Sequence, residues 1–561
     1  MTEPTGAQVA ARAIIAEKVN TVFTLADASI LSILDELIDK GVKVVAVRHE
    51  QAAGNAADGW GRVTRTPGVC FVPMGPGLVN LLPSLVQAYQ AGSPMVAITS
   101  AAPVDMSEMD AFEDIDAVKM VEPFTKWAAR CRNPKQVGKY IRMAFSEAMS
   151  GKKGPVVLEI PKDIQSSSCT DIDFTPDSFR PTGRTTGDVE SIKKAVELLA
   201  GAERPVILAG SGVYWSGAAK ELVNLAEMMN IPVACEFLAL GCIPQSHDLF
   251  IGNAVAQANL FLSQADVMLT IGARFDSFLG FGTDSAIYAE DVKVIHVDID
   301  SSVIGKNRPV DVGIVGDAQA VMRSMLDYAK ASKIERPDTA FANQVRAGYQ
   351  MIVEGFDEEA DPVEVPIRPD RLMRELREFA SPESMFIIDG GDTTAWAFLY
   401  LRAEYPGQII GAQGPLGHLG AGLPIGLAAK TAHPERDVFI VSGDGTFFFN
   451  GVELETAVRQ DIPVVVVVCN DCAWGLVYHT RRIKTGSEEL ACRGTIINED
   501  VRLDKFAESL GAYGETVTKT EDIKPALQRA LDSGKPAVID VRVSREYESI
   551  LSQVLAATPE G

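Results

Sequence analysis

The sequence contains no apolar run long enough to cross a membrane. Its purely apolar stretches, such as residues 464–469, are short, whereas a membrane-spanning helix needs about 20 such residues. The first residues, MTEPTGAQVAARAI, lack the basic stretch and apolar core of a secretion signal. We therefore expect a cytoplasmic protein without a membrane partner.

Basic residues are too few to balance the acidic ones, and the net charge is -23. This excess of negative charge is spread along the chain and argues against nucleic acid or an anionic membrane as a partner. The expected ligand is a small molecule. An anionic cofactor would need local help from backbone dipoles.

The eight cysteines are scattered and do not form a disulfide framework. Cys469 and Cys472 have the spacing of a CxxC motif, which is compatible with redox or metal chemistry. Because Cys469 ends a stretch that reads as a buried strand, ordinary packing is the favoured interpretation. We expect free thiols in a reducing compartment.

Short runs rich in Val and Ile alternate with longer amphipathic stretches, as in VVAVRHE, GVCFVPMG, PMVAITS and PVVLEIP. This alternation is typical of parallel strands joined by helical crossovers and predicts an α/β fold. Two polar stretches, 164–188 and 331–366, interrupt the alternation and are the expected linkers. The sequence thus predicts three doubly wound parallel-sheet domains, at 1–165, 189–330 and 367–547.

The first and third domains carry corresponding landmarks in the same order. GVCFVPMGPGLVN in the first resembles DVFIVSGDGTFFFN in the third, and KKGPVVLEIP resembles SGKPAVIDVR near the end of each. We therefore expect these two domains to share one architecture. Ligands of such sheets bind beyond the carboxyl ends of the strands, so a cofactor between the two domains is expected.

The GDG motif at 443–445 follows one predicted strand directly, and a helical stretch is expected to begin near Asn450. Glycines at this place let backbone amides approach a phosphate, and the Asp444 carboxylate suits a hard cation that bridges phosphate oxygens. A second oxygen ligand, Asp471, follows the next predicted strand, so both should lie at the same sheet edge. The spacing predicts a metal-diphosphate site.

This arrangement resembles the signature of the thiamine diphosphate-dependent family that includes acetolactate synthase, benzaldehyde lyase, pyruvate oxidase and 2-hydroxyacyl-CoA lyase, over nearly the full chain. Family members usually have Asn where this sequence has Asp471, which keeps an oxygen ligand but adds a charge. The third ligand is normally a backbone carbonyl, here that of Ala473. The resemblance implies Mg²⁺ held by Asp444, Asp471 and Ala473.

The first domain supplies the segment RHEQAAG, whose glutamate is Glu50. The resemblance implies that Glu50 hydrogen-bonds the aminopyrimidine ring of the cofactor. A carboxylate there stabilises the imino tautomer, whose nitrogen removes the proton from the thiazolium carbon C2. Glu50 is the expected catalytic residue.

The segment GPLGHLG at 414–420 resembles the part of the family that wedges an apolar side chain under the bent cofactor. The aligned wedge is Leu419, preceded by Gly417, and it would bring the two cofactor rings together. His418 stands where family members have a small Ser or Thr. It is either a substrate-facing acid or base, or a histidine hydrogen-bonded within a packed turn.

Other segments match further family contacts with the cofactor. Most of these contacts surround the diphosphate, and two of them close over the pyrimidine ring. The resemblance assigns them to Pro76, Asn80, Gly391, Asp392, Thr393, Gly443, Gly445, Thr446, Trp474, Gly475 and Leu476.

The substrate pocket is where the sequence departs from its relatives. Asp27 and Ser29 could face the reactive carbon, or they could cap the following helix. Phe112 and Glu113 match a Phe-Gln pair that lines the acetolactate synthase site, so a carboxylate replaces an amide. Trp474, Leu476, His479 and Thr480 also fall at family pocket positions.

The middle domain carries glycine-rich turns at 210–212 and 272–274 and the acidic residues Asp298 and Asp300 after its predicted strands. In relatives, these positions hold FAD or ADP, or nothing. A single Gly-x-Gly at a strand end is weak evidence. A bound nucleotide therefore remains one of the alternatives.

The resemblance implies a homodimer as the smallest active unit, because Glu50 and the GDG motif would serve one site from different subunits, and a homotetramer of two dimers. The expected activity is that of an acetolactate-synthase-like carboligase or lyase acting on 2-oxo acids or 2-hydroxy ketones. The alternative is a 2-hydroxyacyl-CoA lyase or oxalyl-CoA decarboxylase. A non-catalytic cofactor binder would have lost Glu50, which is present.

Overall fold

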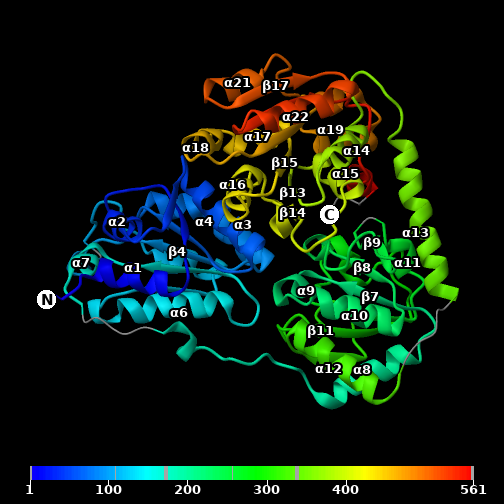
Figure 1. Cartoon of the computed structure of the whole chain (residues 1–561), viewed down its shortest axis with the longest axis horizontal. Coiled ribbons are helices and arrows are strands. Elements are labelled where there is room, and N and C mark those ends of the chain that lie inside the picture. The colour runs from blue at the N-terminus through cyan, green and yellow to red at the C-terminus, as the bar shows by residue number, and fades with distance from the viewer. Residues whose placement is uncertain (1–2, 108, 170–174, 256, 335–339, 558–561) are drawn as a thin grey trace.

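The computed structural model of the chain describes all residues except 1–2, 108, 170–174, 256, 335–339 and 558–561. The described residues form three six-stranded sheets, and the strand pairs within them are parallel. Parallel strands need crossover connections, so helices lie between them in sequence and cover the sheet faces (Figure 1). The predicted α/β fold is confirmed. None of the described helices is long and apolar enough to span a bilayer.

The first sheet has four buried inner strands and two partly exposed edge strands. In spatial order its strands are β2 (Lys43–Ala46), β1 (Thr21–Thr24), β3 (Gly68–Val72), β4 (Met95–Thr99), β6 (Pro155–Glu159) and β5 (Trp127–Arg130). Its helices are α1 (Gly6–Ala16), α2 (Leu31–Asp39), α3 (Glu50–Thr64), α4 (Pro76–Ala91), α5 (Ala117–Val121), α6 (Val137–Met149) and α7 (Lys162–Ser166).

The third sheet repeats the strand order of the first sheet. In spatial order its strands are β14 (Ile409–Gly411), β13 (Met385–Asp389), β15 (Val438–Gly443), β16 (Val465–Asn470), β18 (Ala537–Arg542) and β17 (Tyr513–Val517). Its helices are α14 (Pro369–Phe379), α15 (Asp392–Tyr400), α16 (Gly422–Ala432), α17 (Asp444–Asn450), α18 (Glu453–Arg459), α19 (Gly475–Thr485), α20 (Glu488–Cys492), α21 (Leu503–Ser509), α22 (Ile523–Asp532) and α23 (Ile550–Ala557). The expected relation between the first and third domains is thereby confirmed.

The middle sheet has its own strand order. In space its strands run β12 (Val312–Val315), β11 (Lys293–Asp298), β10 (Val267–Ile271), β7 (Pro205–Ala209), β8 (Val233–Cys235) and β9 (Phe250–Asn253). Its helices are α8 (Val189–Ala200), α9 (Ser211–Ser216), α10 (Ala219–Met229), α11 (Asn259–Leu262) and α12 (Ala318–Ala331).

Helix α3 of the first domain packs against helix α16 of the third domain. Gly59 permits this approach, because a Cβ there would stand 2.8 Å from the Cα of Ile425. Buried side chains of both domains belong to one apolar cluster. Across the same boundary, the Arg48 amide donates to the buried Glu453 carboxylate at 3.0 Å. The two domains therefore hold their loops in a fixed relation.

The segment 331–366, expected to be a linker, contains a long helix, α13 (Ala340–Glu359). Its Tyr349 ring packs edge-on against Phe250 of the middle domain, and the Asp357 carboxylate accepts a hydrogen bond from Arg377 of the third domain at 2.8 Å. The connection thus bridges two domains along their outer side (Figure 1). Residues 170–174 and 335–339 of the two expected linkers lie outside the described part.

Candidate active site

Asp444 and Asp471 follow neighbouring strands of the third sheet. Strands β15 and β16 pair in parallel, with Gly443 opposite Cys469, so the two aspartates leave the same sheet edge. Helix α17 begins at Asp444 and not near Asn450, which corrects the expected start. A carboxylate in the first turn suits the positive end of the helix dipole, and this favours the earlier start.

The Asp444 carboxylate fits a bound cation. Asp444 is only 4% exposed, and its Oδ2 atom is buried without a hydrogen-bond partner. Burial and the nearby charge of Asp471 raise the pKa of Asp444, and burial likewise raises the pKa of Asp471. A buried carboxylate oxygen without a partner is costly unless a cation or donor satisfies it.

The loop after β16 presents Asp471 and turns Asn470 away. The Asn470 amide donates to Asp540 at 2.7 Å, while its oxygen accepts from the Cys472 amide at 3.1 Å. Cys472 has a left-handed φ of 56°, which reverses the chain before Ala473. Among the described residues, no group of three or more His, Cys, Asp or Glu side chains could hold a metal ion. Asp444, Asp471 and Ala473, the three predicted ligands, lie on the two loops that follow β15 and β16.

Glycines of two loops lie next to these carboxylates. A Cβ on Gly391 would stand 2.8 Å from the Leu476 Cβ, and one on Gly445 would stand 2.9 Å from the Trp474 ring. The place of a Cβ on Gly443 lies 3.3 Å from the Thr393 hydroxyl oxygen. The Leu476 and Trp474 side chains thus fill the space beside Gly391 and Gly445, and glycine is needed there for close packing. The backbone amides of these loops and the Thr393 hydroxyl are groups that suit a diphosphate. Thr446 is buried one residue beyond the motif.

Contrary to expectation, the side chains of Asp392 and His479 do not face this surface. Asp392 is the first residue of α15, and its carboxylate contacts His479 and Ser549. His479 is 2% exposed, so it is buried and does not line an open pocket. The prediction that His479 belongs to the substrate pocket is wrong for this structure, because the nearby Asp392 carboxylate and the Arg545 carbonyl hold both ring nitrogens. Only the backbone of Asp392 remains for a ligand.

Glu50 is the first residue of α3 and is 8% exposed. The Asn80 amide donates to its Oε2 atom at 3.1 Å, so the structure brings these two predicted contacts together. Helix α4 begins at Pro76 after Gly75, whose φ is 61°. The Glu113 backbone occupies the space that a Cβ on Gly75 would need. The segment 112–113 therefore lies beside the turn before α4.

The loop that carries His418 and Leu419 is held by hydrogen bonds at its C-terminal end, where it leads into α16. The buried Asp389 carboxylate, at the end of β13, accepts from the Gly422 amide at 2.6 Å and from the Gly420 amide at 3.3 Å. Burial raises the pKa of Asp389 to about 7. Asp389 is therefore a supporting residue that sequence reasoning missed, although its place before the Gly-Gly turn was visible.

His418 contacts the first domain. Its Nε2 atom lies 3.0 Å from the side-chain nitrogen of Gln51, the residue after Glu50. Burial lowers the pKa of His418, so the neutral ring is favoured. This geometry favours the hydrogen-bonded alternative over a free acid or base, with a partner from another domain and not from the same turn. Leu419 is partly buried beside it.

Asp27 does not cap helix α2 as one alternative expected. The N-cap residue of α2 is Ile30, which makes no side-chain bond. Asp27 instead accepts from the Ser29 amide at 2.8 Å and closes the turn before the helix. The Ser29 hydroxyl is buried without a partner. Phe112, by contrast, is 85% exposed.

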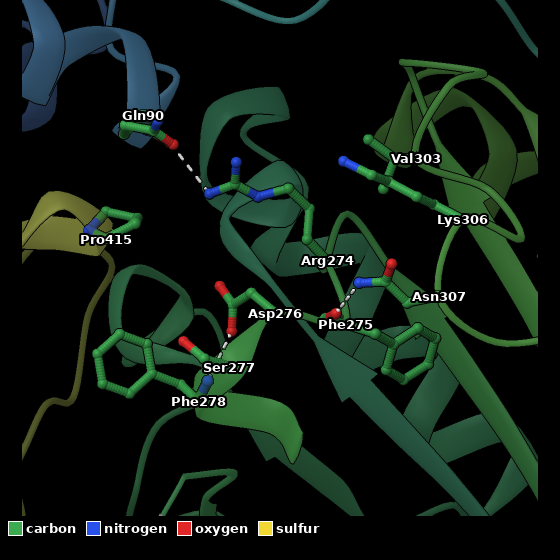
Figure 2. Close-up of a pocket in the computed structure, with 10 residues that line it drawn as sticks. All are labelled: Gln90, Arg274, Phe275, Asp276, Ser277, Phe278, Val303, Lys306, Asn307 and Pro415. Carbon is green, nitrogen blue, oxygen red and sulfur yellow. Dashed lines mark hydrogen bonds between the residues drawn. The ribbon is translucent and has the colours of Figure 1, made fainter. Parts of the chain in front are cut away.

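A cleft lies where the middle domain meets the other two domains. One cavity of about 850 Å³ and a smaller one of about 220 Å³ share Gln90, Arg274 and Val303 in their linings. Figure 2 shows Arg274 reaching toward the Gln90 carbonyl, with Pro415 of the His418 loop on the same side of the view as Gln90. The glycines of the two middle-domain turns touch each other, since a Cβ on Gly212 would stand 2.6 Å from the Gly272 Cα. Their lack of side chains thus has a packing reason.

Comparison with known proteins agrees with this geometry. Residues 4–120 match the N-terminal TPP binding domain of thiamine pyrophosphate enzymes, residues 192–325 match the central domain, and residues 389–541 match the C-terminal TPP binding domain. Each match covers strands of one of the three sheets.

Several curated proteins are similar over almost their whole length. A probable acetolactate synthase large subunit of Methanocaldococcus jannaschii is 34% identical over 96% of this chain and 91% of its own. The corresponding protein of Methanococcus aeolicus is 34% identical, over 98% and 93%. An acetolactate synthase large subunit of Mycobacterium tuberculosis is 32% identical, over 95% and 94%. The chain therefore belongs to the thiamine pyrophosphate enzyme family and is a thiamine diphosphate-dependent enzyme of the acetolactate-synthase-like carboligase group.

Proposed function

We propose that the enzyme holds thiamine diphosphate together with Mg²⁺ and joins or cleaves carbon-carbon bonds of 2-oxo acids or 2-hydroxy ketones. The observation that carries the proposal is the buried, unpartnered Oδ2 atom of Asp444, which lies in a glycine-rich turn whose backbone amides suit a diphosphate. Asp444, Asp471 and the Ala473 carbonyl would hold the ion. When bound, the cofactor supplies a carbon nucleophile that also accepts the electron pair of the broken bond.

The first domain would supply the proton chemistry. Glu50 shares one carboxylate oxygen with Asn80, which leaves the other oxygen to bind and orient the aminopyrimidine ring. The Glu50 carboxylate would thereby act as the acid-base group that supports the cofactor. Leu419 would pack against the cofactor, and the amides around Gly391 and Gly443 would hold its anionic end.

The choice of donor rests on relatives named acetolactate synthase, and a 2-oxo acid is the class of substrate that this name implies. The backbone of Glu113 lies against Gly75 next to the site. A carboxylate there would repel an anionic oxo acid in a nearby pose, so we infer a substrate that keeps its charge away from Glu113. Thioesters of 2-hydroxy acids with CoA remain the second candidate, because the larger cavity of the cleft has room for a nucleotide.

A substrate panel resolved by mass spectrometry tests this proposal. We expect pyruvate or a 2-hydroxy ketone to be converted in the presence of thiamine diphosphate and Mg²⁺, with the activity lost on chelation and restored by Mg²⁺. The control is the Asp444→Asn variant, which keeps the shape of the side chain but loses its charge. Turnover of CoA thioesters alone would move the assignment to the second candidate, and no cofactor-dependent turnover of any compound would refute both.

We also propose that a nucleotide such as FAD or ADP binds in the middle-domain cleft. Lys152, Lys153 and Arg274 line the larger cavity together with Asp298. Burial raises the pKa of Asp298 to about 6. Clustered basic side chains in a protein of net charge -23 give this cavity a charge that suits phosphates.

The nucleotide proposal is tested by heating the purified protein, which releases any bound compound, and by identifying that compound by chromatography. We expect an adenine-containing compound in stoichiometric amount, with a visible flavin spectrum if it is FAD. An Arg274→Ala variant should lose the compound, whereas the matched Arg493→Ala variant, at an exposed position of the third domain, should retain it. Full retention by Arg274→Ala would place the ligand elsewhere, and an empty protein that takes up neither nucleotide would refute the site.

We further propose a homodimer as the minimal active unit and a homotetramer as the assembly. Apolar side chains are exposed on both halves of the site: Val79 and Phe112 in the first domain, and Phe448, Phe449 and Val452 in the third. Exposed apolar side chains on both halves of the site are a surface on which a partner chain would pack. A symmetric partner would cover both halves at once.

The cytosol is the compartment that we propose for this enzyme. All eight cysteines are free thiols in the structure, and the Cys472 sulfur accepts a hydrogen bond from Arg542. Free, mostly buried thiols are typical of proteins that fold under reducing conditions.

A further inference from the structure

The Asp392 carboxylate is held by two donors from distant parts of the chain. Its Oδ2 atom lies 2.5 Å from Nδ1 of His479 on α19, and its Oδ1 atom accepts from the Ser549 hydroxyl at 2.5 Å. Ser549 is fully buried and directly precedes α23. Two segments far apart in sequence thus meet at the first residue of α15.

The partners of the His479 ring fix its charge. Its Nε2 atom lies 2.8 Å from the Arg545 carbonyl oxygen, which can only accept a hydrogen bond. Nδ1 faces a carboxylate, so both ring nitrogens donate and the ring is cationic. Burial lowers the pKa of His479, but the hydrogen bond and charge of Asp392 outweigh it and raise the pKa above its usual value. Asp392 and His479 form a buried ion pair.

This pair stands beside the surface that would hold the diphosphate. Asp392 follows Gly391, and its amide belongs to the N-terminal end of a helix, where an anion is stabilised. A free carboxylate at this place would compete with a diphosphate for the same amides and repel it. The two donors hold the carboxylate away from those amides.

The geometry of α19 ties the same pair to the proposed metal ligand. Gly475 and His479 are one turn apart, so they share a helix face. A Cβ on Gly475 would stand 2.7 Å from Oδ2 of Asp471 and 3.4 Å from Oδ2 of Asp392. The absent side chain thus lets both carboxylates reach the start of α19, where the cationic ring of His479 lies beneath them.

We propose that His479 and Ser549 are positioning residues of the diphosphate site, which hold the Asp392 carboxylate aside so that the amides after Gly390 are free to bind the cofactor. The inference rests on the proposed function, because it assumes that a diphosphate binds there. It gives the segment 545–549 a part in cofactor binding, although that segment lies far from the other cofactor contacts in sequence.

A double-mutant cycle read by calorimetric titration of the full-length protein with thiamine diphosphate and Mg²⁺ tests this role. We expect His479→Gln and Ser549→Ala each to weaken cofactor binding about tenfold or more, since each removes a hydrogen bond to a charged group. In the Asp392→Asn background, which has no charge to restrain, the same substitutions should weaken binding no more than about threefold. Ser552→Ala is the matched control, because this buried hydroxyl donates to the Ser549 carbonyl and does not touch Asp392.

The results distinguish the inference from the proposed function. No binding by the wild-type protein would refute the proposed function itself. Wild-type binding with unchanged affinity in both single variants would overturn the positioning role alone, and so would equal losses in the Asp392 and Asp392→Asn backgrounds, which a purely structural role predicts. If His479→Gln fails to fold, Ser549→Ala with and without Asp392→Asn completes the same cycle.

Discussion

Glu50→Gln is expected to lower kcat by about 10²- to 10⁴-fold, the range that a positioned proton-transfer group contributes. Glutamine keeps the size of the side chain and can still accept from Asn80, so the fold and cofactor affinity should change little. What it removes is the negative charge that would favour the reactive form of the aminopyrimidine. The loss should therefore appear in the chemical step and not in binding.

Exchange of the C2 proton of the bound cofactor for deuterium, stopped by acid and read by NMR, measures that step directly. The exchange rate should fall in parallel with kcat, while the dissociation constant of the cofactor stays within a few-fold of wild type. Glu122→Gln is the matched control, because Glu122 is an exposed glutamate of the same domain. Wild-type exchange in Glu50→Gln would disprove the proposed role of Glu50.

Most of the fold could be predicted because its signals are local. Runs such as those of β15 and β16 are buried on both faces, and such runs are typical of parallel strands. Asp444 and Asp471 directly follow those strands. Their positions at the same edge of the sheet could therefore be predicted from the order of the strands in the sequence. The matching landmarks of the first and third domains likewise predicted two sheets of one strand order.

The remaining features depend on contacts between distant residues. Ser549 carries no local sign that it binds Asp392, because the two residues are far apart in the chain. His479 looks like a pocket residue in sequence, and only the folded chain places the Arg545 carbonyl behind it. Asp27 resembles a helix cap, yet the turn it closes makes Ile30 the N-cap residue. Side-chain partners of this kind need the tertiary structure.

Mixing two inactive variants, Glu50→Gln and Asp444→Asn, is expected to restore about a quarter of wild-type activity if one site takes Glu50 from one chain and Asp444 from another. Random exchange makes about half of the dimers hybrids, and each hybrid then has one intact site and one doubly defective site. The measurement is activity after the two proteins are dissociated together and reassociated, with native mass spectrometry to count hybrids.

The exposed side chains explain why two chains should share the site. Helix α3 already uses one flank to pack against α16 of its own chain, but Val79, next to the Asn80 that binds Glu50, stays exposed, as does Phe449 beyond Asp444. A symmetric partner can cover both surfaces and bring Glu50 of one chain to Asp444 of the other. Mixing Glu50→Gln with Glu50→Ala is the control and should restore nothing, because every site then lacks the carboxylate. Abundant Glu50→Gln and Asp444→Asn hybrids without activity would instead place both residues of each site on a single chain.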